Sequence, residues 1–205
     1  MGTRNLTMVI KGEKPVIAQY GQWDGYPSGQ GATALNFLKK RSMKKFKKKL
    51  ELIRFATEED EKEVKEWLSS IGVNDGWMDM EQSGKYHQQY PLLTRNNGAE
   101  ILQMVYDNTV PAFLTDSADF AKDSLFCEWA YIIDLDKETF EVYSGFNEAP
   151  LKEGDRFFST EEEIKEVGES KYYPVTLVKS YSLSELPGPK TFEKECTPVE
   201  EEEEA

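Results

Sequence analysis

Residues 21–31, with the sequence GQWDGYPSGQG, combine residue types that bind ligands. The segment follows a predicted strand and precedes a predicted helix, so the main-chain amides of residues 29–32 would lie at a helix N-terminus, which suits a phosphate or a carboxylate. Asp24 has the chemistry of a cation ligand or a base, and aromatic rings stack on ligand rings. The sequence therefore predicts a binding site made of Gln22, Trp23, Asp24, Tyr26, Ser28, Gly29, Gln30 and Gly31.

A purely structural interpretation of the same segment stays open. Its glycine spacing matches neither GxGxxG nor GxxxxGK[ST], and the strand before it belongs to a predicted hairpin instead of a βαβ unit. Glycines also permit tight turns, and aromatic side chains also cover the edge of a core.

Other catalytic chemistry is sparse in this sequence. Its one histidine, His87, lies in a polar stretch and is expected on the surface, and Cys127 lies in a predicted central strand, where a buried inert thiol is expected. Acidic residues 134, 136 and 138 alternate like half of a calcium loop but lack its glycine and its final glutamate. An enzyme here would work with Asp24 and Glu128 or Asp134 and a metal, although no metal-ligand set or cofactor is indicated.

The strands that would position the loop are signalled by β-branched and apolar runs. Residues 5–10 and 16–20 predict a hairpin around Gly12, and residues 125–135 and 140–143 predict a central strand and its neighbour. Residues 173–181 alternate like one more strand.

Helices are predicted between these groups of strands. Apolar residues from 32 to 53 recur at helical spacing, with Ser42 in a gap, and Thr57 with Asp60 begins a second helix that Gly72 ends. A third helix is expected from Thr94 to about residue 107, an irregular segment over 74–91, and a short helix after a capping box at 160–163. The expected fold is α+β, a mostly antiparallel sheet with helices packed on it.

Charge is unevenly distributed along the chain, whose formal net charge is −13. Residues 39–49, KKRSMKKFKKK, carry eight basic side chains, whereas residues 200–204 are five glutamates. We expect one domain over 1–186 and a flexible acidic tail over 187–205. Nucleic acid could bind only through Lys39–Lys49, and the acidic remainder opposes its approach. We expect the tail and the acidic helix from Glu58 to screen this basic segment.

No apolar run approaches the roughly 20 residues that a membrane-spanning helix needs. Cys127 and Cys196 fit neither a disulfide framework nor a metal site. These features predict a cytoplasmic protein without a membrane span.

A resemblance to known proteins rests on residues 19–31, QYGQWDGYPSGQG, together with TRNLTMVI near the N-terminus, the helix entry at 32–38 and FCEWAYIIDLDKETFEVYSGF at 126–146. On these segments the sequence resembles a family of uncharacterised proteins from bacteriophages, prophages and fungi, and the resemblance as a whole extends over about two thirds of the chain. The resemblance implies no activity and therefore no catalytic residue. It implies a phage-type accessory or host-modulating role, and the basic segment and glutamate run lie outside it.

Two hypotheses of function follow. In the first, the chain is a binding protein whose loop recognises a protein partner or a small anionic ligand without turnover. In the second, it is a metal-assisted enzyme acting on a nucleotide or another phosphate-bearing small molecule, with Asp24 and the amides of 29–31 at the site and Lys39 or Lys40 neutralising charge.

Overall fold

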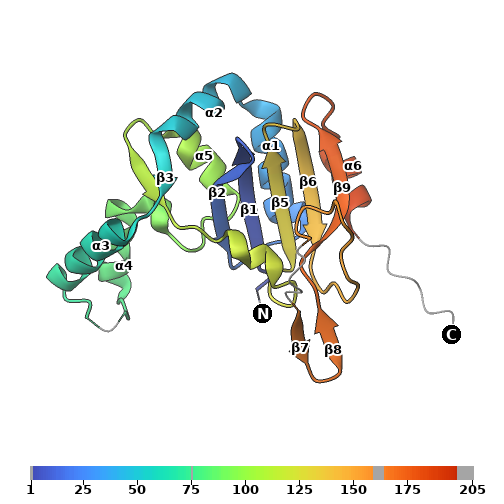
Figure 1. Cartoon of the computed structure of the whole chain (residues 1–205). Helices are drawn as coiled ribbons and strands as arrows, with labels where there is room; N and C mark the ends of the chain where they lie inside the picture. The colour runs from blue at the N-terminus through green and yellow to red at the C-terminus, as the bar shows by residue number, and fades with distance from the viewer. Residues whose placement is uncertain (1, 75, 159–163, 198–205) are drawn as a thin grey trace.

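The computed structural model describes residues 2–74, 76–158 and 164–197. Its centre is a five-stranded sheet in the order β2-β1-β5-β6-β9 (Figure 1). These strands are β1 (Asn5–Lys11), β2 (Lys14–Gly21), β5 (Trp129–Asp134), β6 (Thr139–Ser144) and β9 (Thr176–Ser182). Only β1 and β5 pair in parallel, and the other neighbours are antiparallel. The predicted α+β class with a mostly antiparallel sheet is confirmed.

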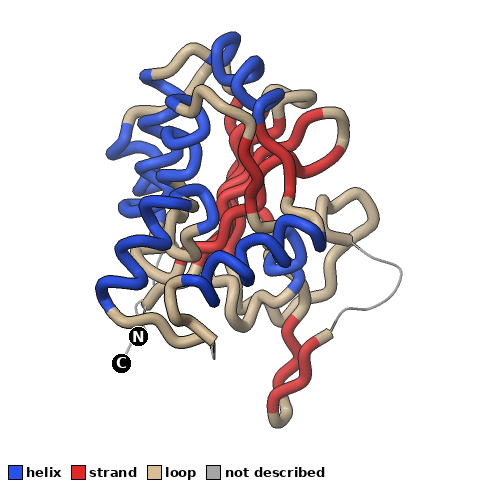
Figure 2. The backbone as a smooth tube through the Cα atoms, turned by 90° about the vertical axis from the view of Figure 1, so that its left-hand side faces the viewer, coloured by secondary structure: helices blue, strands red, loops and turns tan. Residues whose placement is uncertain are grey.

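Helices gather on one face of this sheet (Figure 2). They are α1 (Ala32–Lys40), α2 (Met43–Lys49), α5 (Glu100–Asp107) and α6 (Pro189–Cys196). Their apolar side chains meet the inward residues of β1, β5 and β6 in one buried cluster. Its largest fully buried members are Tyr131, Phe46, Phe140 and Phe192. Burial of these rings is the main force that holds the helices on the sheet.

The opposite face of the sheet is buried as well. Leu6, Met8, Ala130, Ile132 and Tyr143 form a second cluster under η4 (Ala118–Lys122). Because β5 lies in the middle of the sheet and is covered on both faces, all six of its residues are buried. The prediction of a central strand in this segment is confirmed, with a start at Trp129 instead of residue 125.

Smaller elements surround this body. They are η1 (Pro27–Gly31), η2 (Leu50–Leu52), β3 (Ile53–Phe55), α3 (Glu58–Ser70), α4 (Met80–Gln89), η3 (Pro91–Leu93), β4 (Ala112–Leu114), β7 (Lys165–Val167) and β8 (Ser170–Tyr172). Strands β3 and β4 pair in parallel, and β7 and β8 form a hairpin that projects from one end of the body (Figure 1). We call residues 57–90, which hold α3 and α4, the arm, because they also project from the body.

The expectation of one continuous helix over 32–53 is wrong. The chain breaks at Arg41, and the Ser42 hydroxyl accepts a hydrogen bond from the Lys45 amide, so Ser42 caps a second helix, α2. The end of the expected helix is then replaced by η2 and β3. The second predicted helix is confirmed as α3, with a capping box between Thr57 and Asp60.

Two further predictions between residues 74 and 107 need correction. The segment expected to be irregular contains α4, which begins with a capping box between Asp79 and Gln82. The helix expected from Thr94 begins at Glu100, because the chain passes through a left-handed turn at Gly98, with φ of 50°. His87 lies on α4 and is exposed, as expected.

The boundary predicted at residue 187 is wrong. Residues 189–196 form α6, whose Phe192 and Cys196 are fully buried in the main core, so this helix belongs to the domain. The capping box predicted at 160–163 and the glutamate run at 200–204 lie outside the described residues. Within the residues that are described, no helix has the length and apolar composition needed to cross a membrane.

Candidate recognition surface

The predicted binding loop lies at the end of the sheet where β1 and β5 begin and β2 ends. After Gly21, the last residue of β2, the chain turns and enters η1, a single π-helical turn that runs directly into α1. The loop therefore connects the sheet to the helix layer, and both anchor it.

The main-chain amides of the loop are used within the loop itself. The amides of Gly29 and Gly31 both donate to the Tyr26 carbonyl, and the Gln30 amide donates to the Asp24 carbonyl at 2.8 Å. The Ala32 amide donates to the Gly29 carbonyl. The expectation that these donors are directed at a phosphate or carboxylate is therefore wrong: the turn of η1 satisfies them.

Buried hydrogen bonds fix the loop to β1 and β5. The Gly25 amide donates to the Thr3 carbonyl at 2.9 Å, and the Gly25 carbonyl accepts from the Tyr131 hydroxyl at 2.6 Å. The Asn5 side chain donates to the carbonyls of Gly21 and Trp23. The loop thus depends on one side chain from β1, Asn5, and one from β5, Tyr131.

Glycine is required where the loop touches these anchors. A Cβ atom on Gly31 would lie 2.7 Å from the buried ring of Tyr131, and one on Gly29 would lie 2.3 Å from the Asp24 carbonyl oxygen. The glycines therefore permit close packing, as the structural interpretation of the sequence holds.

We expect Tyr131→Phe to lower the free energy of unfolding by about 1–3 kcal/mol, because it leaves the buried Gly25 carbonyl without a donor. Tyr26→Phe is the matched control: Tyr26 is in the same loop and 54% exposed, so its variant should unfold like the wild type. Urea denaturation of both variants measures the difference. Equal stabilities would show that the Tyr131 hydroxyl does not hold the loop.

Two large rings of this fixed loop remain in solvent. Trp23 is 58% exposed and Tyr26 is 54% exposed, and Asp24 and Ser28 are exposed beside them. Gln22 accepts a hydrogen bond from the Tyr20 hydroxyl, and the Gln30 side-chain oxygen accepts from the Ala99 amide. The predicted site residues thus divide into exposed side chains that can contact a partner and side chains that hold the loop.

The same end of the sheet carries another exposed aromatic group. The Phe126 ring, 39% exposed, has the Arg4 guanidinium 4.7 Å from its centre and the Lys165 ammonium 3.9 Å from its centre. Phe146, 55% exposed, follows the end of β6 nearby, with its amide bonded to the Ser124 carbonyl. We call Trp23, Tyr26, Phe126 and Phe146 the aromatic end of the sheet. Sequence analysis missed the last two because strand register alone brings them there.

The residues proposed for an enzyme are not brought together. Lys39 and Lys40 lie at the far end of α1, a nine-residue helix and so about 13 Å from the loop at its start. Glu128 pairs with Arg4 at 3.4 Å, and Asp134 lies at the opposite end of β5 from the loop. The expected pairing of Asp24 with Asp134 is therefore wrong, the Glu128 carboxylate is engaged by Arg4, and the lysines do not neutralise charge at the loop.

Asp134 instead belongs to a buried ionic cluster on the second face of the sheet. Arg156 donates to Asp134 at 2.7 Å and to both carboxylate oxygens of Glu141 at 2.8 Å. The hydroxyls of Thr139 and Tyr143 also donate to Glu141. Burial by itself raises the pKa of both carboxyls, but these hydrogen bonds and the arginine charge outweigh it, so both pKa values lie below their usual range.

Thiol chemistry is disfavoured at both cysteines. Cys127 is fully buried, and burial raises its pKa, while Cys196 is buried beside the Tyr181 hydroxyl and its pKa is raised for the same main reason. We expect neither thiol to react with iodoacetamide in the folded protein and both to react in urea, as measured by intact mass. Rapid labelling of folded protein would contradict this prediction.

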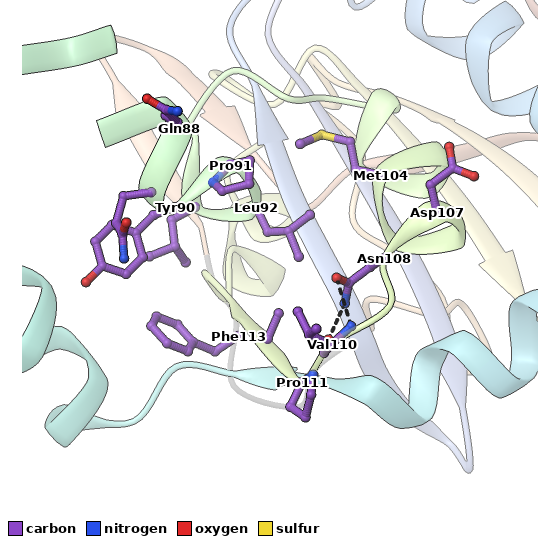
Figure 3. A pocket seen from close by; sticks show the side chains of 13 residues that line it. Gln88, Tyr90, Pro91, Leu92, Met104, Asp107, Asn108, Val110, Pro111 and Phe113 are labelled. Atoms are coloured by element: carbon purple, nitrogen blue, oxygen red, sulfur yellow. Dashed lines mark hydrogen bonds between the residues drawn. The ribbon is translucent and has the colours of Figure 1, made fainter. Parts of the chain in front are cut away.

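Among the described residues, no group of three or more His, Cys, Asp or Glu side chains is placed to hold a metal ion. A large apolar cavity of about 560 Å³ lies elsewhere, between η3, the end of α5 and β4 (Figure 3). Its walls include Leu92, Met104, Val110 and Phe113. Sequence analysis missed this cavity because segments about 20 residues apart form it.

Comparison of the chain with known proteins gives no relative. No protein-family model, no curated protein and no solved structure matches it.

Proposed function

We propose that this chain is a binding protein that recognises a macromolecular partner through the aromatic end of the sheet, with Trp23 and Tyr26 as its main contacts. The observation that supports this most is the contrast within one loop. Its main chain is fixed by buried hydrogen bonds, yet its two largest rings are more than half exposed. Rigid, exposed aromatic side chains lose little conformational entropy on binding, and they dominate the energy of many protein interfaces.

The chemistry of the surface also favours a protein partner over a small anion. Main-chain donors that would hold a phosphate are already bonded inside η1. Two cations at this end, Arg4 and Lys165, are paired with Glu128 and Asp123, and Arg95 lies over the Tyr20 ring. A partner would therefore meet mainly aromatic rings and cations already engaged by carboxylates or rings, which suits an interface core better than an anion site. The resemblance to phage and prophage proteins extends the proposal to an accessory or host-modulating role.

A site-specific crosslinking experiment tests this proposal. A photoreactive phenylalanine analogue is placed at position 23 or 26, and in a control at position 77, which is more exposed than either and lies on the arm. We expect the same partner to be crosslinked from positions 23 and 26 in cells that produce the protein, and not from position 77. Absence of any crosslink at 23 and 26, or identical products from all three positions, would refute the proposal.

The enzyme hypothesis is tested in parallel by thermal unfolding with nucleotides, with and without magnesium. Binding at the loop would raise the midpoint temperature, and Asp24→Ala would abolish the rise without unfolding the protein. We expect no rise, because the main-chain donors are occupied and the lysines are distant. A magnesium-dependent rise that Asp24→Ala abolishes would favour the enzyme.

A further inference from the structure

The arm and the basic segment carry opposite charges and lie apart. Residues 57–90 contain nine acidic and three basic side chains, a net charge of −6, whereas residues 39–49 contain eight basic side chains and no acidic one. The arm projects away from α2 (Figure 1). In the described part of the chain, no carboxylate forms an ion pair with a basic side chain of 39–49. The prediction that the acidic helix from Glu58 screens this segment within the molecule is therefore wrong.

The basic segment remains open to solvent at several side chains. Lys40, Lys44, Lys45 and Lys48 are exposed. The Lys39 ammonium donates to the Pro187 carbonyl, and α6, which follows, packs on α1 and η1. A dense cationic surface without a neutralising neighbour attracts an acidic partner at low salt.

The tip of the arm is apolar and exposed. Between α3 and α4, Trp77 is 84% exposed and Met78 is 37% exposed, and Met80, the first residue of α4, is 95% exposed. Asp79 and Glu81 lie among them, so the tip combines apolar side chains with negative charge. Large apolar side chains gathered at one exposed point mark an interaction site.

The apolar cavity adjoins the basic segment. Its wall includes Asn108, whose carbonyl oxygen accepts a hydrogen bond from the Lys49 ammonium, and Val110 at its edge is 59% exposed (Figure 3). At about 560 Å³ its volume is in the range that encloses large apolar groups. The molecule therefore offers an apolar cavity beside Lys49 of the basic segment, and this combination complements the apolar, negatively charged arm tip.

The arm cannot fill the cavity of its own molecule. The cavity is lined by residues 88–93 at the C-terminal end of α4, and the tip is at its N-terminal end. A ten-residue helix holds the two about 15 Å apart. We infer that the occupant is a second copy of this chain, whose arm places Trp77 and Met80 in the cavity and its α3 carboxylates against the lysines of 39–49. Because each copy has both surfaces, a reciprocal exchange closes as a two-fold dimer.

Charge exchange tests this inference directly. One variant carries Lys44→Glu and Lys48→Glu, and the other carries Glu63→Lys and Glu66→Lys, all four at exposed positions. In a dimer of either variant, the arm of each copy would face like charges on the 39–49 segment of the other copy. In a dimer that contains one copy of each variant, opposite charges face each other at both contacts. We expect the wild type to dimerise at low salt and to dissociate at high salt, each variant to be a monomer, and the equimolar mixture to form a heterodimer, all by analytical ultracentrifugation.

The tip is tested by Trp77→Ser with Met80→Ser, which should weaken the wild-type dimer at least tenfold. Phe146→Ser, an exposed aromatic residue at the aromatic end of the sheet, is the control and should leave the dimer unchanged. A wild type that is monomeric at every concentration and salt, or a dimer that all of these variants retain, would overturn the inference. The inference would also be overturned if the mixed variants formed no heterodimer, or if the protein were a monomer whose lysines bind a polyanion such as heparin. None of these results tests Trp23 or Tyr26, so the proposed function stands or fails separately.

Discussion

Replacing Arg156 by Met is expected to cost about 3–5 kcal/mol in free energy of unfolding at neutral pH, one of the two largest effects that we predict. The guanidinium is the only described cation that pairs with Asp134 and Glu141, whose side chains are 3% and 9% exposed. Without it, two buried carboxylates would face each other without compensation. Methionine fills similar space but supplies no charge and no donor.

The loss should depend on pH in a definite direction. In the wild type both carboxyls have lowered pKa values in the folded state, so their stabilisation is full above the unfolded pKa values of about 4 and is lost as the pH falls through the lower folded values. In the variant, loss of the arginine raises both folded pKa values relative to the wild type, so a fall in pH costs the variant less stability. The gap between the two proteins should therefore narrow as the pH falls from 7 towards 4.

Urea denaturation at several pH values measures this gap. Lys152→Met, an exposed lysine in the same loop, is the matched control and should be neutral. Adding Asp134→Asn and Glu141→Gln to the Arg156 variant should recover part of its stability at pH 7. A loss below about 1 kcal/mol, or a gap that does not change with pH, would contradict the assigned role of the cluster.

Replacing Phe192 by Ala should cost about 3–5 kcal/mol, the second large effect. The ring is fully buried and stacks on Phe140 with ring centres 5.7 Å apart, and it also contacts Tyr181. The variant leaves a cavity between α6 and the sheet. Thr191→Ala, exposed on the same helix, should be close to neutral and serves as the control. Equal stability of the two variants would show that α6 is not part of the core.

The position of Phe192 also decides where the chain can be shortened. Removal of residues 187–205 would delete α6 and expose Phe140, so a loss of binding would report unfolding. Removal of residues 198–205 leaves the described core intact. Any role of the glutamate run should therefore be tested with the shorter deletion.

Much of the fold follows from local pattern. The hairpin of β1 and β2 and the strands β5, β6 and β9 are signalled by alternation and by a run that is apolar on both faces. The capping box at Thr57 marks the start of α3. These signals succeed because each lies within a few residues, where backbone sterics and one hydrogen bond decide the outcome.

The errors have a different physical origin. Helix α4 has Gly84 and few apolar residues, so its only sequence signal is the capping pair of Asp79 and Gln82. In the sequence, Ser42 is one polar position within an otherwise helical pattern. In the structure α1 has ended before it, and its hydroxyl caps the start of α2. The Arg156 cluster joins residues 15 and 22 positions apart, and no local pattern encodes that contact.

The candidate site was only partly predictable. Loop composition identified Trp23 and Tyr26 as groups able to contact a partner. It also suggested free main-chain donors, but these are hydrogen-bonded within the turn of η1. Whether an amide is available depends on the turn that the backbone adopts, which residue types do not determine. The aromatic residues 126 and 146 join them only through the pairing of β5 with β1 and β6.

The parallel pairing of β1 with β5 joins residues 124 positions apart, from Asn5 opposite Trp129 to Ile10 opposite Asp134. During synthesis, the first hairpin must therefore wait for more than half of the chain to leave the ribosome before it gains its second neighbour. Closing so long a span slows folding and leaves the apolar faces of β1 unprotected meanwhile. A nascent chain stalled before residue 129 should accordingly bind chaperones, and one released after residue 197, which includes α6, should not.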